Sequence, residues 1–425
     1  MTSYAAQIRS LKRDTLLFLL YNLLAYVGFG VFQLIFNLYL TELGLRENDM
    51  GAFQFAQTLV MAGAAATMGP VLQRVGIWRS IVGGMTVFLA ASLGLAWAEQ
   101  PPALLALSAV SGAGLAYLFT TTMPFIIAWT PRDQRQHVST LVFAVIGLSG
   151  TVGSLLGGYL PKAIGAEPLW SYRWTLMAGT ALAATAVIPL LMMGASRGAA
   201  APPDPHAARE AADAAERRRV RMDVAVFVLI GGLMAVGAGM VIPFYNVYLT
   251  TLGADAGQIG LVFALAGLAT ATIGLLAPAV ARRWGALLGV TAVRLLGLPL
   301  YAVLLVFPSL WVAVLAHVVR QTTISMAWPI DSTFIAEVLP PKARASVYGL
   351  RSAAWNLIWA LASLAGGQII VRQGYGIPFA LLIASTIVSM GVFAGYYGRH
   401  PRVRSGDLPS ALPRASRQAA GPPDG

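Results

Sequence analysis

The chain contains 425 residues, of which 57% are hydrophobic and only 11% are charged. Soluble domains carry about 25% charged residues, so this composition excludes a soluble protein and predicts that most of the chain lies in lipid. The net charge of +12 does not indicate a nucleic-acid partner, because the basic residues follow the membrane pattern described below. The sequence has no Cys, which excludes disulfides and thiol chemistry.

Apolar runs of about 20 residues recur along the sequence, the length of a membrane-spanning helix and about twice that of a membrane-spanning strand. Only helices and closed barrels satisfy every backbone group in lipid, so the runs predict an all-α membrane protein with twelve transmembrane helices. The first run is too long for a cleaved signal peptide. The expected spans are residues 15–40, 51–72, 80–98, 103–127, 138–161, 171–193, 223–249, 258–281, 286–306, 309–336, 345–371 and 377–397.

Two polar stretches divide these runs. Residues 194–222 contain prolines, Ala-rich segments and the triplet Arg217–Arg219, which predicts a solvated cytoplasmic linker that is helical in part. Residues 399–425 are rich in Pro, Ser, Gly and Arg, which predicts a disordered cytoplasmic tail. We therefore expect one six-helix bundle in residues 1–193 and a second in residues 223–398.

The two expected bundles repeat one pattern at a constant offset of 209 residues. The stretch from Asn37 to Gly76 returns, without a gap, from Asn246 to Gly285. Polar residues and glycines keep the same register, which chance identity between apolar helices would not produce. The chain is therefore expected to be two copies of one structural unit, related by a pseudo-two-fold repeat.

Most of the 29 Lys and Arg residues fall in loops that alternate with nearly uncharged loops. Cytoplasmic loops carry an excess of Lys and Arg, so the basic set is assigned to the cytoplasmic side. This assignment predicts a multi-pass protein of the cytoplasmic membrane with both termini in the cytoplasm. Arg46, Lys162, Arg173 and Arg372 are assigned to the outer loops.

The loop after the second expected span carries a recognisable motif. The sequence Gly69-Pro-Val-Leu-Gln-Arg-Val-Gly76, followed by Arg79, resembles the signature loop of the major facilitator superfamily, with Gln73 where that family usually has Asp. The stretch Gly153-Ser154-Leu-Leu-Gly157-Gly158 is similar to a motif associated with antiporters in that family, with Ser154 replacing Pro.

The resemblance covers about residues 10–398 and implies two six-helix bundles that rock about a central site to give alternating access. Family members of this kind bind substrate near the bilayer midplane, between the halves. The resemblance further implies a cytoplasmic gating region formed by the two equivalent loops. Its residues here are Gly69, Gln73, Arg74, Gly76, Arg79, Arg282 and Arg283.

Asp331 is the one carboxylate that lies clearly inside an expected span, and an ionisable group in the membrane is a functional candidate. On a helix, His317, Arg320, Trp328 and Asp331 fall within an arc of about 80°, which predicts one cavity-facing surface. Arg351 on the next span lies at similar depth, so we expect an ion pair between Asp331 and Arg351. This pair either couples transport to protons or only joins the two helices. Arg320 is a second candidate to compete with a proton for Asp331, and Arg294 is a competing partner.

Polar and aromatic residues on other spans are candidates for substrate contacts. They line a substrate cavity or, alternatively, form interhelical hydrogen bonds and aromatic packing. His317 is a candidate proton relay or, alternatively, a hydrogen-bonding residue. The substrate-binding candidates are Asn22, Tyr26, Gln33, Asn37, Gln54, Gln57, Asn246, Trp328, Trp355 and Trp359.

The sequence contains no nucleotide-binding loop, no nucleophile–base arrangement and no metal-ligand spacing, so we expect neither an enzyme nor a metal or other cofactor. The favoured function is proton-coupled export of a hydrophobic or amphipathic organic compound by a monomer. Uptake or exchange of an anionic metabolite is the alternative within the transporter class. A sensor or scaffold that keeps the fold and transports nothing is the alternative outside it.

Overall fold

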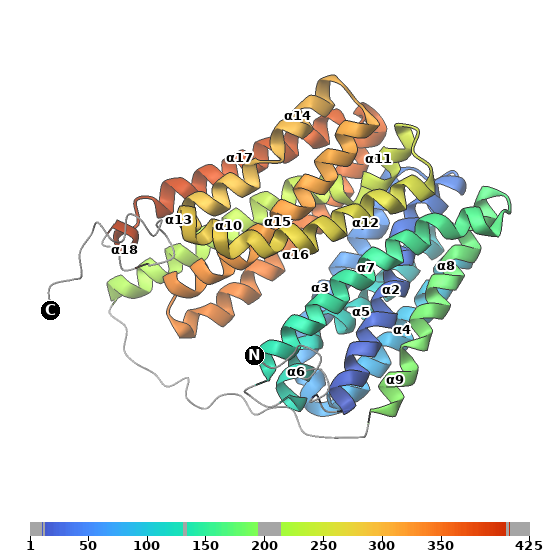
Figure 1. Cartoon of the computed structure of the whole chain (residues 1–425), viewed down its shortest axis with the longest axis horizontal. Coiled ribbons are helices and arrows are strands. Elements are labelled where there is room, and N and C mark those ends of the chain that lie inside the picture. Colours follow the sequence, from blue (N-terminus) through green and yellow to red (C-terminus); the bar gives the residue numbers. More distant parts are fainter. Residues whose placement is uncertain (1–10, 12, 131–133, 194–213, 405–407, 409–425) are drawn as a thin grey trace. The chain divides into compact units, whose positions relative to one another are not determined.

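The computed structural model describes residues 11, 13–130, 134–193, 214–404 and 408, and its regular structure in these ranges is entirely helical. Twelve helical segments of the described chain are long and apolar enough to cross a membrane, as the sequence predicts. The elements are α2 (Arg13–Glu42), α3 (Glu47–Val75), α4 (Ile77–Trp97), α5 (Pro101–Thr120), α6 (Thr122–Trp129), α7 (Arg135–Ile164), α8 (Pro168–Thr185), α9 (Val187–Met192), α10 (Ala214–Val241), η1 (Ile242–Phe244), α11 (Tyr245–Thr251), α12 (Ala256–Ile273), η2 (Gly274–Leu276), α13 (Ala277–Leu295), α14 (Leu298–Val306), α15 (Leu310–Val338), α16 (Pro341–Gln373), α17 (Gly376–Tyr397) and α18 (Pro401–Arg404) (Figure 1).

The chain divides into two compact units. Unit 1 comprises Met1–Pro203 and Asp255–Ala264, and unit 2 comprises Asp204–Ala254 and Leu265–Gly425. Helix α10 begins at Ala214, so the last part of the stretch expected to be a linker is helical, and most of its first part lies outside the described residues.

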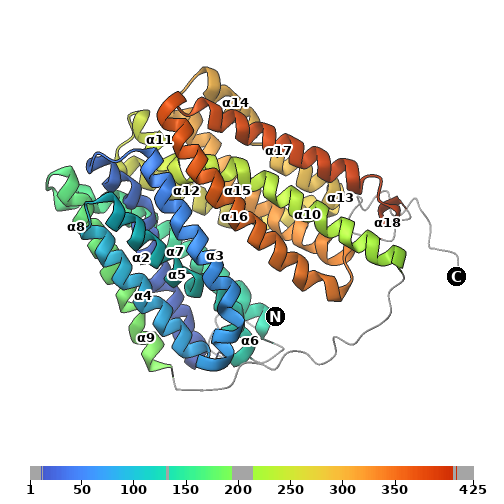
Figure 2. The same ribbon diagram turned by 180° about the vertical axis from the view of Figure 1, so that it is seen from behind.

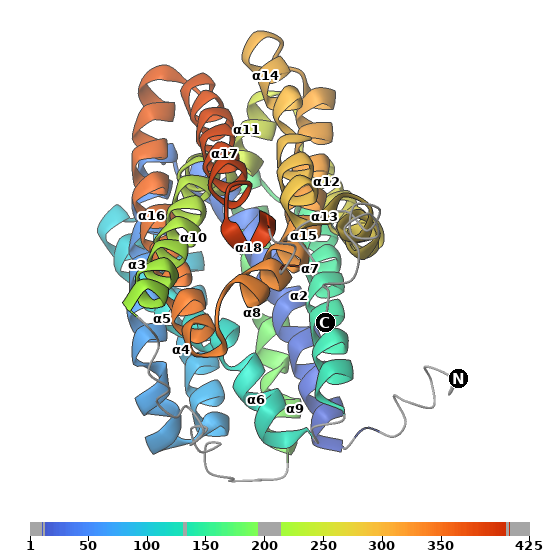
Figure 3. The ribbon, with the colours of Figure 1, turned by 90° about the vertical axis from the view of Figure 1, so that its left-hand side faces the viewer.

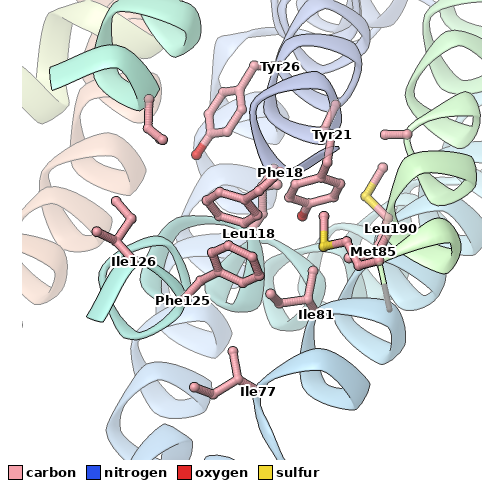
Figure 4. Close-up of a cluster of buried hydrophobic side chains, with 14 of the residues drawn as sticks. Phe18, Tyr21, Tyr26, Ile77, Ile81, Met85, Leu118, Phe125, Ile126 and Leu190 are labelled. Atoms are coloured by element: carbon pink, nitrogen blue, oxygen red, sulfur yellow. The ribbon is translucent and has the colours of Figure 1, made fainter. Parts of the chain in front are cut away.

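In unit 1, α2 packs against both α7 and α8, while α5 packs against α3 and α4 (Figure 3). The apolar faces of these helices meet in a cluster of buried side chains. Figure 4 shows Phe18 of α2 and Phe125 of α6 at its centre, where their rings stack with centroids 3.7 Å apart. Tyr26 lies at the edge of the same cluster (Figure 4). Burial of such aromatic rings holds the helices of the unit together.

In unit 2, α10 takes the place that α2 has in unit 1 and packs against α16 and α17 (Figure 2). Helix α13 packs against α15 and α17. The core contains Phe227 of α10, Phe334 of α15 and Tyr397 of α17, with the Tyr397 ring 4.9 Å from the first and 5.0 Å from the second. This aromatic core fixes α15, which carries Asp331.

Backbone geometry confirms the repeat at single-residue level. Within the described residues, a positive φ occurs only at glycines, which adopt it without the steric penalty that a Cβ would bring. Each such glycine of the first half has a counterpart 209 positions later, so the two copies turn at equivalent points. The pairs are Gly44 (φ 77°) with Gly253 (φ 87°), Gly76 (φ 89°) with Gly285 (φ 71°), and Gly165 (φ 68°) with Gly374 (φ 75°).

The packing contacts repeat as well. A Cβ placed on Gly157 of α7 would meet the Val31 carbonyl oxygen of α2 at 3.2 Å. A Cβ placed on Gly366 of α16 would meet the Met240 carbonyl oxygen of α10 at 3.0 Å. Both members of the second pair stand 209 positions after those of the first. Close backbone approach at a glycine thus defines the same helix pair in each unit.

Five expected spans are not continuous helices. Breaks occur between α5 and α6, between α8 and α9, at η1 after α10, at η2 between α12 and α13, and between α13 and α14. Each break lies at a Pro or in the turn before one, because Pro lacks an N–H and its ring clashes with the carbonyl four residues earlier. The prolines are Pro124, Pro189, Pro243, Pro278 and Pro299. In contrast, α15 continues as one helix through Pro329.

Two expectations about charged segments need correction. The basic-residue pattern assigns Arg173 to an outer loop, but it is buried in α8, where it pairs with Glu99 at 2.6 Å and faces the rings of Trp97 and Trp170.

Composition predicts a disordered tail from residue 399 onward, but α18 forms at its start. Arg402 of α18 donates to the Val338 carbonyl oxygen at 2.9 Å. The rest of the tail, apart from residue 408, lies outside the described residues.

Candidate functional site

A cluster of three charged residues from three helices lies inside unit 2. Asp331 of α15 accepts from Arg351 of α16 at 2.5 Å and from Arg294 of α13 at 3.1 Å. The Asp331 side chain is only 4% exposed, and those of Arg294 and Arg351 are 7% and 14% exposed. The expected contact with Arg351 is therefore present, and Arg294 is a second partner rather than an alternative one.

Local sequence explains why these residues meet. Pro340 precedes α16 and Pro341 occupies its first turn, so the chain reverses between α15 and α16. Asp331 and Arg351 lie at comparable distances before and after this reversal and therefore reach similar depth. Arg294 arrives on α13, which packs against α15.

The cluster carries two guanidinium groups and one carboxylate, so it retains a positive charge. Removing charges from water costs free energy that a buried pair regains only with good geometry. The single carboxylate holds both arginines, and deleting one partner of a buried pair typically costs about 3–5 kcal/mol. Asp331 is therefore central to the cluster, because without it two cations would face each other.

A cavity of about 310 Å³ lies beside this cluster, within unit 2. Arg294 and Arg351 line it, and Arg320 of α15 contributes a third guanidinium. The remaining wall is mostly aliphatic and aromatic. It is formed by Met234, Ala238, Ile242, Gly297, Leu298, Tyr301, Gln321, Thr323, Ile324, Trp328, Trp355, Trp359, Leu382 and Thr386.

The aromatic wall of the cavity comes mainly from α16. Arg351, Trp355 and Trp359 follow at intervals of four residues and so share one helix face. The two indole rings stack with centroids 6.1 Å apart and an interplanar angle of 28°. The Arg351 guanidinium carbon lies 6.0 Å from the centroid of the Trp328 ring. All three tryptophans proposed for substrate contacts therefore lie at this cavity.

Arg320 differs from the other two arginines of the cavity. It forms no ion pair with any described residue, and the groups that act on it electrostatically are the Tyr245 and Tyr301 hydroxyls and His317. His317 is buried, stacks on Tyr245 with centroids 4.9 Å apart, and does not line the cavity. Thus Arg294, Arg320 and Arg351 line one cavity, Asp331 adjoins it through its two arginine partners, and the proposed relay residue His317 does not line it.

The candidates on α2 and α3 belong to unit 1. Asn22 is fully buried, and its amide nitrogen donates to the Phe18 carbonyl oxygen at 2.7 Å. Tyr26 is buried against Phe29 and Phe119. These contacts give Asn22 and Tyr26 packing roles within their own unit.

The remaining polar candidates differ in exposure. Gln33 is exposed and Asn37 is half-buried. Gln54 and Gln57 donate to Thr58 and Ser111 at 3.0 and 2.9 Å, which gives them intrahelical and interhelical partners respectively. Asn246 is buried in α11, where its side-chain oxygen accepts from the Val247 N–H at 3.0 Å.

Most of the residues assigned to the gating region lie within three residues of a turn at Gly76 or Gly285. Gln73, Arg74 and Arg79 are exposed around the turn at Gly76, and Arg282 and Arg283 are exposed before the equivalent turn at Gly285. Gly69 is also exposed on α3. Their gating role stays a prediction.

Sequence reasoning missed several residues at the cavity. Gln321, Thr323 and Tyr301 line it with the predicted residues. Gln321 and Thr323 sit beside Arg320 and Ile324 in the sequence, so a wider arc of the same helix face would have included them. Tyr301 lies on α14, whose sequence carries no polar pattern. No group of metal-ligating residues occurs among the residues that the structure describes.

Comparison with protein families gives a match over most of the chain. The model described as Major Facilitator Superfamily matches residues 18–318 and 227–421.

Among curated proteins, partial relatives are found. The Methylenomycin A resistance protein of Streptomyces coelicolor is 31% identical over 117 residues, which cover 27% of this chain and 23% of that protein. The methyl viologen resistance protein SmvA of Salmonella typhimurium is 30% identical over 119 residues, which cover 28% and 24%. The matched stretches thus span about a quarter of these relatives.

Solved structures show the same architecture at low identity. The nucleoside transporter NupG gives a TM-score of 0.68 at 16% identity, covering 91% of this chain and 98% of that chain. The D-xylose-proton symporter gives 0.68 at 16% identity, covering 89% and 97%. At such identities the likeness establishes the fold alone.

Proposed function

The chain belongs to the Major Facilitator Superfamily and is a secondary transporter rather than an enzyme, and we propose that it exports a hydrophobic or amphipathic organic compound in exchange for protons. Transport proceeds by alternating access, with Asp331 as the coupling carboxylate. The protein works as a monomer in the cytoplasmic membrane, with both termini in the cytoplasm.

The observation that carries this proposal is the position of Asp331. It is buried, belongs to a membrane span, holds two arginines and lies beside a cavity. An ionisable group inside a membrane span is costly, so one that is kept there is a functional candidate. A buried charge needs compensation, so Asp331 can leave Arg351 only if it binds a proton instead, and this exchange is what a proton-coupling residue requires.

The cavity wall supports the substrate class. Its aliphatic and aromatic side chains suit an apolar body, and its few polar groups would orient one end of it. Two partial relatives are named as resistance proteins, which favours export over uptake. Uptake or exchange of an anionic metabolite remains the second candidate, because three arginines line the cavity.

The proposal is tested in proteoliposomes with a matched panel of labelled naphthalene derivatives that carry a carboxylate, an amide or an ammonium group. We expect a pH gradient to drive accumulation of at least one member. Asp331→Asn mimics the protonated acid, so it should abolish gradient-driven accumulation while preserving counterflow without a gradient.

Glu42→Gln is the matched control, because Glu42 is an exposed carboxylate at the end of α2. It should accumulate the panel at the wild-type rate. Gradient-driven accumulation by Asp331→Asn at the wild-type rate would remove the coupling role. Absence of both accumulation and counterflow for every member would instead favour a sensor or scaffold.

A further inference from the structure

We infer that the transported compound is an amphipathic organic anion, whose anionic group binds Arg320 while its apolar body lies against Trp355 and Trp359. This inference rests on the proposed transport function and specifies the substrate class of the same cavity. It concerns binding alone, and so it can be tested in the absence of any gradient.

The first argument is the state of Arg320. Its guanidinium is partly buried at the cavity wall and has no carboxylate partner among the described residues. An arginine does not lose its proton in proteins, so its positive charge has to be compensated by another group rather than removed by deprotonation. Two tyrosine hydroxyls supply only dipoles. A carboxylate or similar anion in the cavity would supply the missing charge and bind the planar guanidinium through two parallel hydrogen bonds.

The second argument is the charge balance of the whole site. Arg294, Arg320 and Arg351 line the cavity, and Asp331 is the one carboxylate, among the described residues, that pairs with any of them. A ligand with a negative charge reduces this excess, whereas an ammonium group would add to it. In a low-dielectric site this difference decides between ligands of equal size and shape. The site therefore selects anions over cations.

The third argument is the division of the cavity into polar and apolar parts. Trp355 and Trp359 offer adjacent stacked rings, and Met234, Leu298 and Leu382 add aliphatic surface. A small inorganic anion would leave this surface without a partner. An organic anion with an aromatic or aliphatic body would cover it, and burial of apolar area favours binding.

The experiment measures binding to the purified, full-length protein in detergent by isothermal titration calorimetry. The probes are 2-naphthoate, 2-naphthamide and 2-naphthylmethylammonium, which share one apolar body. We expect naphthoate to bind at least about tenfold more tightly than naphthamide, since a hydrogen bond between charged groups is stronger than a neutral one. The ammonium probe should bind more weakly than the amide.

Variants locate the anion. Arg320→Gln should reduce naphthoate affinity to that of naphthamide and leave naphthamide affinity unchanged, and Arg320→Lys should retain part of the preference. Arg372→Gln is the matched control, because Arg372 is exposed at the far end of α16 from the charged cluster and should alter neither affinity. Asp331→Asn should strengthen naphthoate binding, because it frees the two other arginines.

The inference is overturned if wild-type protein binds naphthamide or the ammonium probe as tightly as naphthoate, a comparison that needs no variant. It is also overturned if folded Arg320→Gln keeps the full preference for naphthoate. Different results would contradict the anion assignment and the transport proposal. Gradient-driven transport of neutral or cationic probes alone contradicts the anion assignment, whereas Arg320-dependent binding without any transport contradicts the transporter proposal.

Discussion

At the scale of single residues, the second partner of Asp331 changes what a mutation should do. An isolated pair between Asp331 and Arg351 would leave an uncompensated buried charge when Arg351 is removed. In this protein Arg294 remains at 3.1 Å from Asp331 after that change. The pair thus becomes a simple one-to-one ion pair, and the excess positive charge of the cluster disappears.

We therefore expect Arg351→Ala to lower thermal stability only modestly, and Arg294→Ala to do the same. The double variant Arg294→Ala/Arg351→Ala should be much less stable, by about 3–5 kcal/mol, because it leaves Asp331 buried without a cation. Adding Asp331→Asn to the double variant should recover much of this loss. Unfolding midpoints of the purified proteins in one detergent test the order.

The outcome that contradicts this interpretation is additivity. If the two single effects sum to the double effect, the two arginines do not share one carboxylate energetically. A triple variant as unstable as the double one would show that the loss comes from packing of the arginine side chains rather than from the stranded charge.

The ion pairs of this cluster were only partly predictable from the sequence. The sequence predicts the pair because both residues lie at similar depth on adjacent spans, a matter of helix rise alone. It names Arg294 only as a competitor, because helix rise does not determine the lateral packing of α13. Arg173 is misplaced for the same reason, since its partners Glu99 and Trp97 belong to a loop and a helix far away in the chain.

At the scale of helices, glycines determine which elements pack closely. Gly157 and Gly366 each lie against the backbone of the first helix of their unit, α2 or α10. Small residues permit such approach, and in lipid the association of helices depends on this packing because the apolar surroundings supply little driving force. The 209-residue repeat alone is enough to place these two glycines in register.

Gly366→Leu should weaken the contact between α16 and α10, and Gly157→Leu should weaken the equivalent contact between α7 and α2. A larger side chain in a well-packed contact typically costs about 1–3 kcal/mol. The controls are Gly349→Leu in α16 and Gly147→Leu in α7, where a Cβ would meet no atom within 4 Å. Thermal unfolding in detergent should separate the first two variants from the controls. Equal unfolding midpoints for all four would show that close packing at Gly157 and Gly366 does not determine stability.

The breaks within spans show what the apolar pattern leaves out. Hydropathy locates twelve spans because lipid demands about 20 apolar residues, whatever the helix geometry. It does not distinguish Pro124, near which one helix ends and another begins, from Pro329, through which α15 continues. That difference depends on whether neighbouring groups satisfy the freed carbonyl, which is a property of the packed unit.

At the scale of the whole molecule, the fold was predictable because three independent signals agree: span length, the repeat at 209 residues and the signature loop. The substrate site was predictable only in part. The tryptophans line one cavity with Arg320 and Arg351, whereas the polar candidates of α2 and α3 lie in unit 1, where Asn22 and Gln57 have hydrogen-bond partners of their own. The residues on one helix face can be derived from sequence periodicity, but a cavity depends on how the faces of several helices pack together.

The orientation of the molecule rests on the distribution of Lys and Arg and is open to a direct test, which the absence of native Cys makes simple. Arg79 is exposed after the turn at Gly76, and Arg283 is exposed before the equivalent turn at Gly285. Because these two turns are copies of one another and six expected spans separate them, both should face the cytoplasm. An impermeant thiol reagent should label Arg79→Cys and Arg283→Cys in inside-out vesicles only.

Arg372→Cys is the opposing control for this orientation. Arg372 lies in the last turn of α16, and the turn after it at Gly374 is the copy of the turn at Gly165, which follows Lys162. The charge pattern assigns both of these basic residues to the outer side, so Arg372→Cys should be labelled in right-side-out vesicles only. Labelling of all three positions from the same side would contradict alternation of the spans. If all three positions were labelled from the sides opposite to those expected, the fold would stand but both termini would lie outside. The basic linker and tail would then break the rule that positive charge stays in the cytoplasm.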